Sequence, residues 1–125
     1  MATVKTFEGL EVWQQARKLV KEIYRVSSAG PFSKDFNLKD QLRRAAISIL
    51  SNIAEGFERA GNREFAHFLY MAKGSAGELR SQLYVALDLA YISPEDFQAP
   101  SSASETIARR LSALIKYLQR PSAKT

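Results

Sequence analysis

The stretch from Leu38 to Arg59 constrains the fold more than any other part of the sequence, because its apolar residues recur at helical spacing on two adjacent faces. Projected at about 100° per residue, the wider face is a continuous apolar stripe. Its members are Leu38, Leu42, Ala45, Ala46, Ile49, Ile53, Gly56 and Phe57. A narrower strip beside it holds Ile47, Leu50 and Ala54. A helix that is apolar over so much of its circumference is predicted to pack against partners on two sides.

Helical periodicity extends over most of the chain and predicts four helices, over residues 7–27, 38–60, 62–92 and 102–120. The third is the longest and has an apolar face about 100° wide along its whole length. That face is formed by Phe65, Phe68, Leu69, Ala72, Ala76, Leu79, Leu83, Ala86, Leu87 and Ala90.

Glycine, proline and capping residues indicate where the first three helices end and begin. Gly30 and Pro31 are predicted to end the first helix, since glycine tolerates the left-handed conformation after a helix and proline cannot continue one. Phe32 and Phe36 follow in the connector and are expected to plug the end of the core. Asn62 is the predicted N-cap of the third helix.

The segment before the last predicted helix carries two start signals. Ser93 and Pro94, followed by acidic residues, are typical of a helix start and predict one short turn. Pro100 is expected to interrupt that turn, because proline lacks the amide hydrogen that a helix interior needs. Ser102 and Glu105 then offer a capping box for the helix over 102–120.

These elements predict a single all-α domain over residues 1–125, an antiparallel up-down four-helix bundle. A chain of 125 residues that is 46% hydrophobic is long enough to bury a core without disulfides or metal. No alternation of apolar and polar residues is long enough to predict strands. The last four residues, 122–125, are expected to fray.

Composition excludes several classes of function. The chain has no cysteine, which removes thiolate chemistry and cysteine-zinc sites and fits a reducing compartment. It has no apolar signal core and no run of the roughly 18 to 20 apolar residues that a membrane span requires. A cytoplasmic location without membrane association is therefore expected.

The charge is positive and unevenly distributed. The net charge of +5 permits association with nucleic acid or another anionic partner. Residues 81–108 contain four acids and no Lys or Arg, whereas every charged residue from Arg109 to the end of the chain is basic. The candidate nucleic-acid-binding residues are Lys18, Lys21, Arg25, Arg43, Arg44, Arg109, Arg110, Lys116 and Arg120.

A polar stripe runs beside the buried face of the second predicted helix, through Ser48, Asn52, Glu55 and Arg59. We expect these side chains to form an interhelical hydrogen-bond network, in which an arginine neutralises the glutamate, because unpaired buried polar groups cost about 1 to 3 kcal/mol each. An alternative is that Glu55 faces Glu78 of the third helix as a carboxylate pair suited to acid-base chemistry.

Metal and catalytic sites receive little support. Glu64 and His67 match the Glu-x-x-His spacing of di-iron bundles once, but His67 is the single histidine of the chain. No nucleophile elbow and no glycine-rich phosphate loop is present. We expect no catalytic residue, no metal site and no cofactor.

A second strip on the third predicted helix indicates assembly. It consists of Tyr70, Gly74, Gly77, Ser81 and Tyr84. Glycine inside a helix costs about 1 kcal/mol relative to alanine, and close approach of another helix is the simplest reason for it. Together with the strip of Ile47, Leu50 and Ala54, it would be left exposed to water in a monomer, so we expect both strips to form a subunit interface.

Three short motifs carry a resemblance to a known family. They are Leu10-x-Val12-Trp13-x-x-Ala16, Ser48-x-x-x-Asn52-Ile53-Ala54-Glu55-Gly56 and Gly74-Ser75-x-x-Glu78-Leu79. With them the chain resembles the bacterial four-helix-bundle family named for open reading frames in ribosomal-RNA intervening sequences. The likeness spans nearly the whole chain, although Leu50 stands where many members carry proline.

The resemblance implies a helical bundle that assembles as a ring-like homo-oligomer, often a pentamer, and places Glu78 with the polar network. It also implies kinship with accessory proteins of diversity-generating retroelements, which bind a reverse transcriptase and nucleic acid. The first functional hypothesis is accordingly a non-enzymatic oligomer that binds nucleic acid, or a partner that processes it, through basic surfaces. The alternative is a structural or protein-interaction bundle whose positive charge serves solubility.

Overall fold

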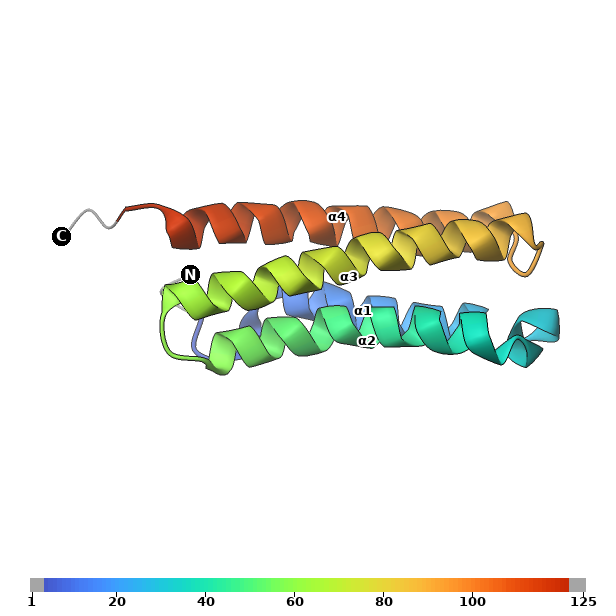
Figure 1. The fold of residues 1–125 in the computed structure, drawn as a ribbon, viewed down its shortest axis with the longest axis horizontal. Coiled ribbons are helices and arrows are strands. Elements are labelled where there is room, and N and C mark those ends of the chain that lie inside the picture. The colour runs from blue at the N-terminus through green and yellow to red at the C-terminus, as the bar shows by residue number, and fades with distance from the viewer. Residues whose placement is uncertain (1–3, 122–125) are drawn as a thin grey trace.

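The computed structural model describes residues 4–121, which form four long α-helices and two short 3-10 turns. Residues 1–3 and 122–125 lie outside the description, and with them the expected fraying of the C-terminus. In chain order the elements are η1 (Phe7–Gly9), α1 (Glu11–Val26), η2 (Gly30–Lys34), α2 (Phe36–Glu58), α3 (Asn62–Asp88) and α4 (Pro94–Gln119). Consecutive helices run in opposite directions (Figure 1).

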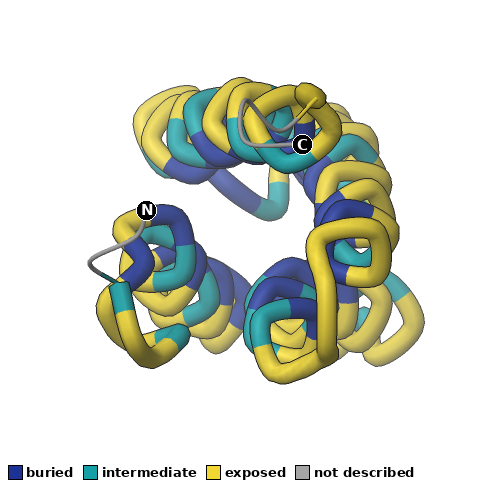
Figure 2. Tube along the Cα trace, turned by 90° about the vertical axis from the view of Figure 1, so that its left-hand side faces the viewer, coloured by how far each residue is buried: buried dark blue, intermediate teal, exposed yellow. Residues whose placement is uncertain are grey.

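The four helices surround a single core. Each packs against its two neighbours in the order α1, α2, α3, α4 and back to α1. The end-on view shows buried residues on the inward side of every helix (Figure 2). The largest fully buried side chains are Ile23, Phe32, Leu42, Ile49, Ile53, Leu69, Leu79, Leu83, Ile107 and Leu111. The prediction of an all-α, antiparallel four-helix bundle is confirmed, and no strand occurs within residues 4–121.

The start of the chain differs from the single helix predicted over 7–27. Leu10 has extended dihedrals, with φ −75° and ψ 125°, so the segment divides into η1 and α1. Phe7 packs edge-on against Trp13, with ring centroids 5.1 Å apart. Leu10 itself is buried, which explains the break: the extended residue turns an apolar side chain into the core before the helix proper begins.

The largest correction concerns α4, which begins at Pro94 rather than at residue 102. Ser93 caps it by accepting a hydrogen bond from the amide of Asp96 at 3.1 Å. Pro100 lies within the helix instead of interrupting it. It removes only its own backbone hydrogen bond to residue 96, and its ring is buried in the core, so apolar burial offsets a disruption of about 3 kcal/mol. Ser102 accepts a hydrogen bond from Gln98 and caps nothing.

The start of α2 and the N-cap residue of α3 differ from those expected from the sequence. Asp35 accepts a hydrogen bond from the amide of Leu38 at 3.1 Å and starts α2 at residue 36, not 38. Gly61, with φ +92°, is the N-cap of α3, so the prediction of Asn62 as the cap is wrong. Glycine can adopt this left-handed conformation without steric cost.

At its other end α3 stops at Asp88 rather than at residue 92. Ala90 has φ +60°, and its amide and that of Tyr91 bond back to carbonyls of the last helical turn. Tyr91 stacks on Phe32, with centroids 5.2 Å apart, and donates its hydroxyl hydrogen bond to Asp35 at 2.9 Å. The loop between α3 and α4 is thereby held against the start of α2.

Of the two connector phenylalanines that were predicted to close the end of the core, only one does so. Phe32 is fully buried and closes the end of the core as expected. Phe36 is 65% exposed, and the Lys39 ammonium lies 4.7 Å from its ring centroid. Tyr91 occupies the position over Phe32, which explains why a second phenylalanine is not needed there.

No helix in residues 4–121 combines the length and the apolar character that crossing a membrane would require.

Candidate nucleic-acid interface

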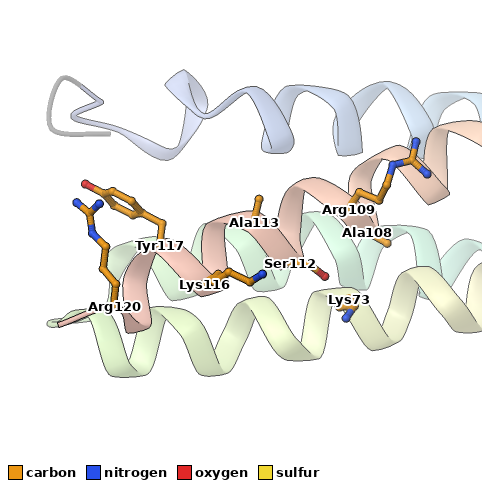
Figure 3. Close-up of a pocket in the computed structure, with 8 residues that line it drawn as sticks. All are labelled: Lys73, Ala108, Arg109, Ser112, Ala113, Lys116, Tyr117 and Arg120. Atoms are coloured by element: carbon orange, nitrogen blue, oxygen red, sulfur yellow. The ribbon is translucent and has the colours of Figure 1, made fainter.

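The outer surface of α4 carries a shallow groove of about 760 Å³ that is lined by four basic side chains. Six lining residues belong to α4, Arg120 is the C-cap of that helix, and Lys73 reaches the groove from the neighbouring α3 (Figure 3). We call this surface the basic groove. Its lining residues are Lys73, Ala108, Arg109, Ser112, Ala113, Lys116, Tyr117 and Arg120.

Helical periodicity explains why these residues gather. The lining residues from the last helix recur every three or four residues, which places them on one side of α4. They are at positions 109, 112, 113, 116, 117 and 120. The opposite side buries Ile107, Leu111 and Ile115 in the core. The floor of the groove is made of small residues, and the longer cationic side chains rise around it.

The groove is positively charged without local compensation. No Asp or Glu among residues 4–121 lines it, and within that range none of its four cations forms an ion pair. Arg109 makes one long hydrogen bond, to the Thr106 hydroxyl at 3.4 Å. Arg120 lies over the Tyr117 ring, 4.1 Å from its centroid. These cations are therefore available to an anionic ligand.

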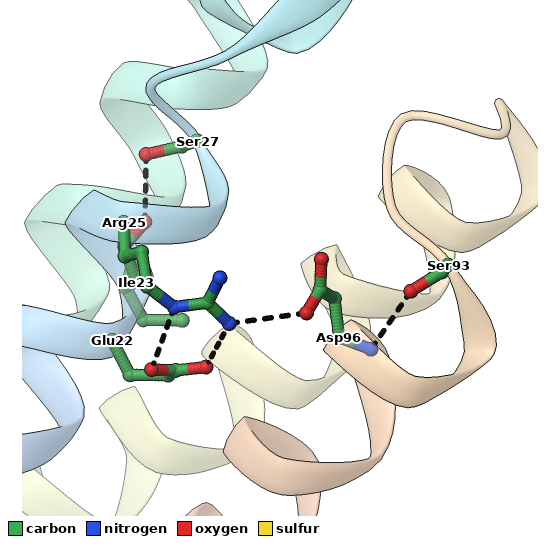
Figure 4. Close-up of polar contacts among 6 residues, drawn as sticks. All are labelled: Glu22, Ile23, Arg25, Ser27, Ser93 and Asp96. Atoms are coloured by element: carbon green, nitrogen blue, oxygen red, sulfur yellow. Dashed lines mark hydrogen bonds and ion pairs between the residues drawn. The ribbon is translucent and has the colours of Figure 1, made fainter.

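The other predicted cations are dispersed, and several are engaged within the chain. Arg25 donates to both carboxylate oxygens of Glu22, at 3.1 and 2.6 Å, and to Asp96 at the start of α4, at 3.0 Å (Figure 4). Arg110 pairs with Glu11 at 2.7 Å. These arginines tie α1 to α4 across the bundle.

Arg43 is engaged by a second cluster, at the junction of α1 and α2. Its guanidinium donates to the hydroxyls of Ser27 at 2.8 Å and Ser28 at 3.1 Å, and lies 4.2 Å from the centroid of the Tyr24 ring. Ser27 in turn is buried and donates to the Ile23 carbonyl at 2.7 Å. Arg43 therefore has a structural role within the bundle.

Three predicted cations lie on other surfaces. Lys18 lines a separate groove between α1 and α4, which also contains Glu22. Lys21 on α1 and Arg44 on α2 are exposed. Of the nine cations proposed from the sequence, the structure brings together Arg109, Lys116 and Arg120.

Sequence reasoning missed Lys73, the fourth cation of the basic groove. It lies on α3, three residues after Tyr70 and four before Gly77, so it borders the exposed strip predicted there. Spacing places it beside that strip but does not show that α4 packs on that side. Only the antiparallel pairing of α3 with α4 brings Lys73 beside Ala108 and Ser112.

The Arg25 cluster predicts a pH dependence of stability. The hydrogen bond from Arg25 lowers the pKa of Glu22 below its ordinary value of 4.5, against the smaller, opposing effect of burial. A lowered pKa in the folded state stabilises the protein above the unfolded-state pKa, and this contribution is lost as the pH falls through the folded-state pKa.

We therefore expect Arg25→Gln to lower the melting temperature at pH 7 and the difference from the unmodified protein to close below about pH 4. Thermal unfolding followed by circular dichroism, from pH 7 down to about pH 3, measures this difference in melting temperature. Lys21→Gln, an exposed change on the same helix, is the control and should show no pH-dependent difference. A gap for Arg25→Gln that persists undiminished at the lowest pH would contradict this account of Glu22.

The uncharged part of the polar stripe of α2 reaches α3 through Ser48. The hydroxyl oxygens of Ser48 and Ser75 lie 2.8 Å apart and share a hydrogen bond between the helices. Asn52 donates its side-chain amide to the hydroxyl and the carbonyl of Ser48, at 3.0 and 2.9 Å. The link is half-buried and fixes how α2 and α3 lie against each other.

The charged members of the stripe are on the surface. Arg59 donates to Glu55 at 2.7 Å and contacts Glu64 of α3 at 3.5 Å. Glu78 accepts a hydrogen bond from Gln82 at 3.4 Å. Each glutamate thus has its own partner, and neither contact joins Glu55 to Glu78 as a carboxylate pair.

The two proposed interface strips lie on different sides of the bundle. Ile47 is exposed, and Leu50 and Ala54 are half-buried on α2. On α3, Tyr70, Gly74, Ser81 and Tyr84 are exposed and Gly77 is half-buried. Tyr84 packs against Phe97 of α4, with ring centroids 4.9 Å apart. A methyl group added at Gly74 or Gly77 would meet no atom within 4 Å, so packing within the chain explains neither glycine.

A metal centre finds no ligand set in the described part of the chain. No group of three or more His, Asp or Glu side chains within residues 4–121 could hold a metal ion. His67 is exposed on α3, and its ring lies edge-on to Phe68.

Comparison with known proteins supplies an independent assignment. A family model described as "23S rRNA-intervening sequence protein" matches residues 8–113. A crystal structure of a protein of unknown function from Bacteroides thetaiotaomicron, described as belonging to the S23 ribosomal protein family, superposes with a TM-score of 0.78 and 24% sequence identity. The match covers 84% of this chain and 95% of that one, and at this identity it supports the fold alone. No curated protein matches the chain.

Proposed function

The chain belongs to the 23S rRNA-intervening sequence protein family, and we propose that it is a non-enzymatic, oligomeric protein that binds the phosphate backbone of nucleic acid through the basic groove. The proposal follows the geometry of α4 and its neighbour α3. The family match itself carries no activity.

One observation carries the proposal. Lys73, Arg109, Lys116 and Arg120 line one groove in which no carboxylate from residues 4–121 competes for them. Phosphate oxygens are strong acceptors for lysine and arginine, and binding them releases counterions from the nucleic acid. Side chains that contact only phosphates do not read base sequence, so the proposed binding is insensitive to sequence.

Self-association is the second part of the proposal. Arg43, one helical turn before Ile47, donates to Ser27 at the end of α1, so the strip on α2 adjoins the side of that helix that faces α1. Tyr84 of the α3 strip packs on α4 instead. A contact between two different surfaces of identical subunits is heterologous, and such contacts form a ring when the rotation between neighbouring subunits closes and a filament when it does not. The family resemblance suggests five subunits, and a ring would repeat the basic groove once per subunit.

Charge reversal tests the binding proposal. A labelled single-stranded oligonucleotide is titrated with the protein, and its fluorescence anisotropy gives Kd at several salt concentrations. Four phosphate contacts on a single strand predict that affinity falls about fifty-fold between 50 and 200 mM salt. The double variant Arg109→Glu with Lys116→Glu should weaken binding at low salt at least tenfold and should flatten the salt dependence.

The matched control is Lys18→Glu with Lys21→Glu, which changes the net charge equally on α1. It should retain most of the affinity. An equal loss in both double variants would show that overall charge, not the basic groove, attracts the nucleic acid. Affinity that does not change with salt would reject the proposal and favour a protein-interaction bundle.

Static light scattering tests self-association, because one subunit has a mass of 14.0 kDa. A particle of several subunits at micromolar concentration is the expected result. A mass of one subunit would reject the oligomeric part of the proposal and leave the basic groove as a feature of a monomer.

A further inference from the structure

We infer that the basic groove is selective for single-stranded nucleic acid and that Tyr117, together with Arg120, forms its base-stacking platform. This inference rests on the proposed function and specifies its ligand. It assigns to the groove a second mode of contact, stacking, besides the attraction between cations and phosphates.

The stacking platform is built into the wall of the groove. Tyr117 is 39% exposed, so part of its ring is accessible to a ligand. The guanidinium of Arg120 lies 4.1 Å from the ring centroid, and the close-up shows it beside the ring at the end of the groove (Figure 3). Aromatic rings and guanidinium planes both stack on nucleic-acid bases, and this contact does not depend on base sequence because every base has a π-face.

The shape of the groove favours a single strand over a duplex. Its floor of Ala108, Ser112 and Ala113 is small-sided, which leaves room for a base or sugar between the cations. In a duplex the faces of the bases are stacked on one another, so a tyrosine ring on the protein surface cannot stack on a base without unstacking the duplex. Arg109 and Arg120 are eleven positions apart, about 16 Å along the helix axis, which suits a short stretch of single strand.

A second tyrosine-arginine pair lies elsewhere in the chain, and it lacks the free guanidinium and the surrounding cations that a base-stacking platform needs. Tyr24 is 38% exposed and has the Arg43 guanidinium 4.2 Å from its ring centroid. The Arg43 guanidinium is held by hydrogen bonds to Ser27 and Ser28. The Arg120 guanidinium forms no hydrogen bond within residues 4–121 and contacts the Tyr117 ring. Tyr24 also lies outside the basic groove.

Three probes of equal length separate stacking from phosphate attraction. They are a twelve-nucleotide oligothymidylate, an abasic strand with the same phosphates, and a duplex of twelve base pairs, each titrated by fluorescence anisotropy. We expect oligothymidylate to bind at least tenfold more tightly than the abasic strand. Tyr117→Leu should remove that preference without changing abasic binding or the salt dependence, and Tyr117→Phe should keep it.

Tyr24→Leu is the matched control, since it removes an equally exposed ring beside an arginine, and it should leave the preference intact. Equal, salt-dependent binding of the oligothymidylate and abasic probes would overturn the stacking inference while the proposed function stands. Equal weakening of both probes by Tyr117→Leu would also overturn it, because it would show a structural role for the ring. Absence of salt-dependent binding to any probe would instead remove the proposed function.

Discussion

Gly56→Ala is expected to lower the free energy of unfolding by about 2 kcal/mol. A Cβ atom at this position would lie 2.6 Å from the Cβ of Phe68, and 3.1 and 3.3 Å from the ring and carbonyl of Phe65. Because the Phe68 Cβ is attached directly to the backbone of α3, it cannot rotate away, and the two helices must separate. The gain in helix propensity, about 1 kcal/mol, offsets only part of this cost.

Gly74→Ala is the matched control, because no atom lies within 4 Å of a methyl group added there. Within one subunit helix propensity then acts alone, so at a protein concentration low enough to dissociate the oligomer the free energy of unfolding should rise by up to about 1 kcal/mol. Urea unfolding of both variants at one protein concentration measures the contrast. If Gly56→Ala were as stable as the unmodified protein, α2 and α3 could not approach as closely as described.

Leu79→Ala is expected to lower the free energy of unfolding by about 3 kcal/mol. Leu79 lies on α3, fully buried in the core of the bundle. Truncation removes apolar contacts and leaves a cavity that the rigid surrounding helices fill only in part. For a chain of this size the melting temperature should fall by about 10 °C.

Leu89→Ala makes the same chemical change at a site that is 51% exposed, at the end of α3. It should change the free energy of unfolding by no more than about 0.5 kcal/mol. Circular dichroism during thermal unfolding compares the two variants. Similar losses for both would mean that the described core does not dominate stability.

The helices themselves could be predicted because each is amphipathic over several turns, and the core face of the segment 62–92 is the clearest example. Their ends were less predictable. Pro100 is an ordinary helix breaker by local rules, yet burial of its ring retains it within α4. Phe32 and Phe36 are both apolar aromatics in the same connector, so the sequence predicts burial of both. Tyr91, from a distant part of the chain, occupies the position over Phe32.

Prediction of the candidate site was limited in a similar way. The sequence placed Arg109, Lys116 and Arg120 on one basic helix together with Arg110, because a run of cations without acids can be seen from the order of residues alone. The sequence could not separate them from Arg25 or Arg43. Glu22 is a local partner of Arg25, but Asp96, its second partner, and Ser27, the partner of Arg43, lie outside the helix of the arginine that they engage.

The sequence by itself determined the helical class, the bundle and the basic character of the last helix, because these depend on composition and on spacing along a single helix. Only the tertiary structure decided which cations have no ion-pair partner within residues 4–121, that Lys73 joins the groove and that α2 approaches α3 at Gly56. These are relations between separate helices, and they depend on the rotation and register with which the helices pack, which no local pattern encodes.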